Sequence, residues 1–241
     1  MYKRQVNNRL LAVLGLPVIL HDIGKILPVY QIRPSNWGYG YKYHEVVGAI
    51  VVDKLLDAIE DKLESISDEV EELPYGYLKT LVVAPILLHH YAFREVQEKQ
   101  VILFFRSRVH LRDYRVINGS DIKSLLEEVL EKSISLQTDY RLHSLLKELI
   151  ASTNQVGDIV IDRNSISRLF ENIFGLYRAR GVKTNYSIEI YVSVITGVVS
   201  IADYIAGSLA RSGCKVKGYP LKILSSREIG VLKNTICRSF S

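Results

Sequence analysis

The stretch VILHDIGKILP, residues 18–28, places a histidine and an aspartate between two apolar segments. Burying such an ionisable pair is costly unless both side chains have partners, so His21 and Asp22 require a partner that satisfies them. The apolar run Leu10–Leu20 before them is too short to span a bilayer and does not end at a small-residue cleavage site. We therefore expect a buried helix here, not a secretory signal or a membrane anchor.

Outward from this stretch, apolar residues recur at helical spacing along most of the chain. Residues 4–14 and 15–24 are expected to form one or two apolar helices, with Pro17 as a break or first turn. Further helices are expected over residues 44–64, 76–93, 120–152, 165–180 and 187–211. Residues 33–43 have the composition of a loop, and residues 100–118 that of a helix followed by an irregular basic segment. The tail CKVKGYPLKIL, residues 214–224, has room for a short β hairpin before a final helix. The pattern predicts a single all-α domain covering residues 1–241.

The composition favours a folded intracellular protein. Hydrophobic residues make up 48% of the chain and charged residues 24%, which excludes global disorder. Lysine and arginine exceed aspartate and glutamate by 31 to 26, a balance that weakly favours a polyanionic partner such as nucleic acid. Cys214 and Cys237 lack the spacing of a thiolate metal site or of a disulfide framework, so we expect a cytoplasmic location.

Histidines and aspartates are concentrated on the apolar helical segments. A single buried histidine is usually satisfied by one hydrogen bond, but buried acids seldom lack a partner, and a metal cluster would satisfy all of these side chains together. Imidazole and carboxylate donors suit Mn, Fe, Co, Ni or Zn, with Mg as a further option. Two such ions could activate water and stabilise the oxygens of a phosphoryl group during its displacement. The candidate ligands are His21, Asp22, His44, His89, His90 and Asp203.

Four motifs carry these residues: ILHDIGK (19–25), YHEVVGAI (43–50), LLHH (87–90) and SIADYIAGSL (200–209). In this order they resemble the HD superfamily of metal-dependent phosphohydrolases, and most closely the HD nuclease of type I CRISPR interference systems. The chain has no GxxxxGK[ST] sequence, so it is similar to the stand-alone form and not to the form fused to a helicase. The resemblance implies an HD-domain-like helical bundle that cuts phosphodiester bonds, in single-stranded DNA or alternatively in RNA. It also implies a separate helicase subunit and an RNA-guided surveillance complex as partners, and no membrane.

Carried over by motif, the resemblance implies that His21, Asp22 and Asp203 hold one ion. It places His44, His89 and His90 around a second ion, with Asp22 between the two. Asp22 and Lys25 would be the catalytic residues, with Lys25 facing the substrate phosphate or the attacking water. The alternative for Lys25 is a solvated lysine at a helix C-terminus. No histidine precedes His21, where the family usually has a further ligand, so we expect one or two ions per chain.

Basic and aromatic residues are candidates for nucleic-acid binding. Arg33, Trp37, Tyr39 and Lys42 lie in the loop that leads into His44 and could stack bases and hold phosphates. The loop could equally serve to cover the core. Arg106 and Arg108 could extend a phosphate track or form a solvated face.

Two other functions stay open at this point. The chain could be an HD phosphohydrolase that acts on nucleotides or cyclic dinucleotides, for which a closed pocket over the metals would be expected. It could also be a catalytically impaired binding subunit, and the missing upstream histidine is the observation in favour of this alternative.

Overall fold

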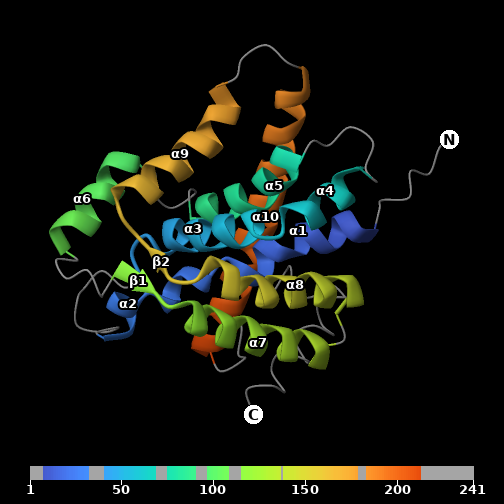
Figure 1. Ribbon diagram of the computed structural model, residues 1–241, viewed down its shortest axis with the longest axis horizontal. Coiled ribbons are helices and arrows are strands. Elements are labelled where there is room, and N and C mark those ends of the chain that lie inside the picture. The colour runs from blue at the N-terminus through green and yellow to red at the C-terminus, as the bar shows by residue number, and fades with distance from the viewer. Residues whose placement is uncertain are drawn as a thin grey trace.

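A computed structural model describes residues 8–32, 41–68, 75–90, 97–108, 115–136, 138–178 and 183–212. Within these residues the fold is mostly helical, which confirms the all-α prediction (Figure 1). The elements are α1 (Asn8–Leu20), η1 (Ile23–Ile26, a 3-10 helix), α2 (Pro28–Ile32), α3 (His44–Asp57), α4 (Glu60–Asp68), α5 (Tyr75–Leu88), α6 (Glu98–Arg108), β1 (Val116–Ile117), α7 (Gly119–Ser135), α8 (Tyr140–Val156), β2 (Ile159–Val160), α9 (Arg163–Arg178) and α10 (Lys183–Ser212).

The first helix differs from the sequence-based expectation. Of the two alternatives, one helix or two, the structure has one: α1 continues through Pro17 to Leu20, and Pro17 marks neither a break nor a first turn. Proline removes one backbone hydrogen bond, but α1 packs against both α5 and α8, and this tertiary packing outweighs the loss. The expected helix over 15–24 is also wrong at its end, because His21 and Asp22 form a turn before η1.

Two predicted long helices are each divided in the structure. The segment 44–64 breaks after Asp57, and α4 starts at Glu60. The segment 120–152 breaks between α7 and α8, where the Asp139 carboxylate accepts a hydrogen bond of 2.8 Å from the Arg141 backbone N–H. Aspartate is a preferred residue at this position because it satisfies a free N–H of the first turn.

β1 and β2 form a short antiparallel pair, with Val116 opposite Val160 and Ile117 opposite Ile159. These strands flank the α7 and α8 pair, and the residues 214–224 that were expected to form a hairpin lie outside the described residues. A pairing between segments this far apart is not visible in a local sequence pattern.

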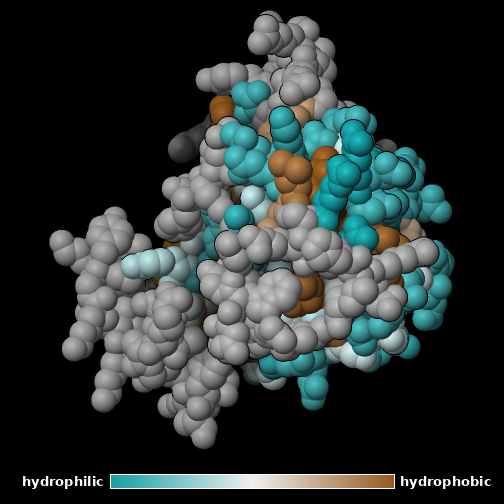
Figure 2. Space-filling view, turned by 90° about the vertical axis from the view of Figure 1, so that its left-hand side faces the viewer, coloured by the Kyte–Doolittle hydropathy of each residue, from teal (hydrophilic) through white to brown (hydrophobic). Residues whose placement is uncertain are grey.

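Helix α3 forms the centre of the core. All its side chains are buried except those of Lys54 and Asp57, and it packs against η1, α5, α8 and α9. α10 covers α5 on another side. On the face of the molecule in Figure 2, polar side chains surround small patches of apolar ones.

A pair of glycines lets η1 approach the start of α3 closely. A Cβ atom on Gly24 would lie 1.9 Å from the His44 carbonyl oxygen and 2.5 Å from the Gly48 nitrogen. One on Gly48 would lie 3.2 Å from the Gly24 nitrogen. Only glycine fits this backbone-to-backbone contact. The contact places the turn of His21 and Asp22 beside His44.

We expect Gly24→Ala to lower the free energy of unfolding by about 3 kcal/mol, because the added methyl group has to push η1 away from α3. Urea denaturation followed by circular dichroism measures this change.

Gly15→Ala is the matched control. Gly15 lies within α1, and its Cβ would lie 3.8 Å from the methyl groups of Leu142 on α8, which is an ordinary van der Waals contact. In this variant the free energy of unfolding should rise by about 0.5–1 kcal/mol relative to the parent protein. A Gly24→Ala protein as stable as the parent would contradict the close packing.

Candidate metal centre

Four parts of the fold bring the six predicted ligands together. His21 and Asp22 lie in the turn after α1, and His44 is the first residue of α3. His89 and His90 directly follow α5, and Asp203 lies within α10. These elements meet because α3 packs against η1 and α5, while α10 packs against α5 and α1.

The six side chains form two neighbouring groups. His44, His89 and His90 make one group, and His21, Asp22 and Asp203 make the other. In each group one ligand atom per residue lies within 4.8 Å of the others. Donors about 2 Å from one ion lie at most about 4 Å apart, so these atoms are near the separation that a shared ion needs. Each group could therefore bind a metal ion.

Three of the imidazole rings are held in the same way. In each, Nδ1 donates a hydrogen bond to the backbone carbonyl three residues earlier. The contacts are His21 to Val18 at 2.9 Å, His44 to Tyr41 at 2.7 Å and His89 to Ile86 at 2.7 Å. Because a carbonyl oxygen only accepts, Nδ1 carries a proton in each ring, and Nε2 of the neutral ring keeps its lone pair. Anchoring one ring nitrogen in this way orients the other for a metal.

Asp22 lies between the two groups. Its Oδ2 accepts a hydrogen bond of 2.6 Å from Lys25 Nζ and lies 3.5 Å from His21 Nε2. Its Oδ1 lies 3.1 Å from His44 Nε2, although these two atoms are not aligned as a hydrogen bond. The backbone at Asp22 (φ −94°, ψ 0°) is in the sparsely populated bridge region, where many active-site residues lie.

Three potential metal-donor atoms of this cluster are buried without a hydrogen bond to any residue that the structure describes. They are Asp22 Oδ1, His44 Nε2 and His89 Nε2. A buried polar atom in this state carries its full desolvation cost. A divalent cation would satisfy all three atoms, so these residues fit a metal ion.

Neighbouring charges set the protonation of this cluster. Burial disfavours the protonated form of His21, but Asp203, Asp22 and the Val18 carbonyl together raise its pKa above the ordinary value. Burial alone would raise the pKa of Asp22, yet His44, His21 and Lys25 hold that pKa well below its usual range.

The pKa shifts of His89 and Asp203 favour metal ligation. Burial and the neighbouring His90 lower the pKa of His89 to about 3, which keeps this ring neutral. The interaction with His21, at 3.6 Å, lowers the pKa of Asp203 despite burial. At neutral pH both carboxylates are ionised and His89 has a free lone pair, as metal binding requires.

The remaining predicted residues are only partly described. Lys25 is 33% exposed and stands 5.3 Å above the centre of the Tyr41 ring. Lys42 lies over the rings of Tyr43 and Phe104, which links the loop before α3 to α6. Arg106 is exposed on α6. Arg33, Trp37, Tyr39 and the side chain of Arg108 lie outside the described residues.

Two residues that were not predicted from the sequence, Glu45 and Ser200, also support the cluster. Glu45 is fully buried, with Oε2 3.5 Å from His44 Nδ1, behind the metal-facing side of the ring. Ser200 donates a 2.7 Å hydrogen bond to the His89 carbonyl and so joins α10 to the end of α5. Glu45 could have been recognised in the sequence, because an acid directly after His44 in an apolar helix is unusual. The Ser200 contact could not, because it depends on how two distant helices pack.

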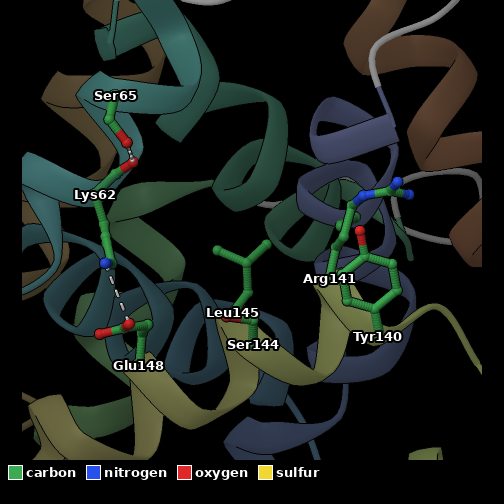
Figure 3. A pocket seen from close by; sticks show the side chains of 8 residues that line it. Lys62, Ser65, Tyr140, Arg141, Ser144, Leu145 and Glu148 are labelled. Carbon is green, nitrogen blue, oxygen red and sulfur yellow. Dashed lines mark hydrogen bonds and ion pairs between the residues drawn. The ribbon is translucent and has the colours of Figure 1, made fainter.

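A separate hollow of about 290 Å³ lies between α1, α4 and α8 (Figure 3). Its charged groups already have partners: Lys62 Nζ lies 3.4 Å from Glu148, and Arg141 lies 3.1 Å from Asp139. It contains none of the metal-ligand residues. We assign it no role.

Comparisons with protein-family models, curated proteins and solved structures find no match to this chain. The resemblance to the HD superfamily therefore stays a prediction that rests on the four motifs. The geometry of the six side chains is the observation from which function can be argued.

We expect the affinity for Mn²⁺ to increase with pH. The raised pKa of His21 means that, below this pKa, the metal has to displace a proton from the ring, whereas Asp22 and Asp203 are already ionised. Displacing one proton gives up to about a tenfold gain in affinity per pH unit, levelling off above the pKa of His21. Isothermal titration calorimetry at several pH values measures this dependence.

His21→Gln should bind Mn²⁺ more weakly and with a flatter pH profile. His143→Gln is the control, since His143 bonds to Thr138 outside the cluster. An affinity that falls as the pH rises would contradict the assignment.

Proposed function

We propose that this protein is a divalent-metal-dependent nuclease that hydrolyses phosphodiester bonds, with single-stranded DNA as the expected substrate. The main support is the pair of adjacent ligand groups joined by Asp22, with buried donor atoms that have no hydrogen bond. Divalent ions bound there would supply activated water at neutral pH and neutralise charge on the phosphoryl oxygens. Two ligand groups side by side suit this chemistry better than a single structural ion.

Asp22 is the central residue of the proposed mechanism. Its low pKa keeps it ionised, and Lys25 orients one carboxylate oxygen while the other stays directed at His44. The three anchored imidazoles hold their Nε2 atoms in fixed positions. The site is therefore preorganised, since its ligands need little rearrangement before the substrate arrives.

Lys25 is the residue proposed to meet the substrate phosphate. Its ammonium group is partly exposed and lies 2.6 Å from Asp22 Oδ2. It would place a positive charge next to the ions. Such a charge stabilises the extra negative charge that develops on phosphorus oxygens during displacement.

A polyanionic substrate agrees with the charge of the protein. The chain has a formal net charge of +5. Lys42 lies just before His44, and its contact with Phe104 brings it near α6, which carries Arg106. The helicase partner, the RNA-guided surveillance complex and the cytoplasmic location stay predictions from the resemblance and the composition.

We expect Asp22→Ala to reduce cleavage of an end-labelled single-stranded DNA by at least about a hundredfold in Mn²⁺ or Mg²⁺, because it removes the carboxylate shared by both groups. Gel electrophoresis of time points measures the rate. Circular dichroism should show an unchanged fold, since Asp22 lies in a turn.

His143→Ala serves as the activity control and should cleave at the parent rate. Cleavage by Asp22→Ala at that same rate would contradict the proposal. Mononucleotides or cyclic dinucleotides hydrolysed in preference to oligonucleotides would favour the phosphohydrolase alternative. DNA binding that survives Asp22→Ala, without metal-stimulated turnover in the parent, would favour the impaired binding subunit.

A further inference from the structure

α10 has a second apolar face, which is exposed among the residues that the structure describes. In Figure 1 this helix (orange) crosses behind the other helices from the top to the bottom of the bundle. Large apolar side chains on it are between 48% and 59% exposed, whereas core side chains of the same kinds are almost completely buried. These exposed residues, together called the outer face, are Ile190, Tyr191, Val194, Val198, Ile201 and Tyr204.

The spacing along the outer face is typical of helix packing. The inner face has Ile188, Val192, Ile195 and Val199, with steps of four, three and four residues, and all are buried in the core. Four outer-face residues follow the same rhythm, at positions 190, 194, 201 and 204, and Gly197 completes the row between Val194 and Ile201. An average step of 3.5 residues keeps a row of side chains aligned with a partner helix. The outer face therefore has the pattern of a second helix-packing seam.

By length and composition the segment Ile188–Gly207 could cross a membrane, and only 17% of it is buried. Two contacts favour a place in the bundle instead. Asp203, inside this segment, lies 3.6 Å from His21 of the metal centre. Ser200 is bonded to the His89 carbonyl. An acid paired with a side chain from the turn after α1 anchors α10 to the rest of the bundle.

We propose that two copies of this chain pair through the outer face, with the two α10 helices antiparallel and crossing at Gly197. The proposal does not depend on the nuclease assignment. The face carries no charged residue, and apolar residues lie on both sides of Gly197, with Ile190 and Tyr204 each seven positions away. A face with the same character in both directions is self-complementary, as a two-fold interface requires.

Space and area agree with a second copy as the occupant. No described residue lies within 4 Å of a Cβ atom built on Gly197, so another helix can approach closely at the crossing point. About half of each of six large side chains is exposed, which gives roughly 600 Å² per copy and about 1,200 Å² for the pair, the lower end of stable interfaces.

Pairing in this way leaves both metal centres accessible. At about 100° per residue, Asp203 projects from the side of α10 opposite the middle of the outer face. The two clusters of a dimer would therefore face away from the contact between the helices.

The test is the mass of the full chain in solution, by light scattering after size-exclusion chromatography. We expect twice the 27.4 kDa of one chain. The double variant Val194→Glu and Ile201→Glu should elute as a monomer with unchanged helicity and unchanged Mn²⁺ binding. Ile134→Glu is the matched control, because Ile134 on α7 is 51% exposed and Ile201 is 50% exposed. It should remain a dimer.

A cross-linking variant tests the crossing point without adding charge. With Cys214 and Cys237 changed to serine, Gly197→Cys should form a covalent dimer on mild oxidation, because the two thiols would meet at the axis. Ile134→Cys in the same background should not. A monomeric parent chain would overturn the proposal, as would flotation of the parent with phosphatidylcholine vesicles that the double glutamate variant abolishes.

Discussion

The contact between the backbone of Gly24 and the first turn of α3 is the constraint on which the candidate site depends. It leaves no room for a side chain at Gly24, and it brings a turn at the end of α1 against the start of a helix more than twenty residues later. His21 and Asp22 come from one side of this contact and His44 from the other. α5 and α10 then add the remaining ligands, because both are held by the same central core.

Polar groups in such a core are stable only if something compensates their desolvation. Part of the compensation is visible as hydrogen bonds from three imidazole rings to backbone carbonyls and as the ion pair of Asp22 with Lys25. Among the described ligand residues, two imidazole nitrogens (of His44 and His89) and one oxygen of Asp22 are left without a hydrogen bond. These atoms belong to one cluster of side chains. A cation bound there would stabilise them, whereas an apolar core would not.

α10 combines three roles that its sequence keeps on separate faces. One face packs in the core, a narrow polar sector presents Asp203 and Ser200 to the candidate metal centre, and the outer face is apolar and exposed. A helix that is hydrophobic on nearly all sides is normally buried on nearly all sides. Pairing between copies would reconcile this composition with the exposure of the outer face, and it would also support the helix that positions Asp203.

The sequence by itself determined the helical class and the identities of the six clustered side chains, because apolar periodicity and the His and Asp motifs are local patterns. It did not determine where helices stop, as Pro17 and the breaks after Asp57 and before Asp139 show, because packing can override or add to local preference. Only the tertiary structure decided which ring nitrogen each histidine presents, that Glu45 lies behind His44, and that Ser200 joins α10 to His89. These depend on distances between segments far apart in the chain, and no local pattern of residues records such distances.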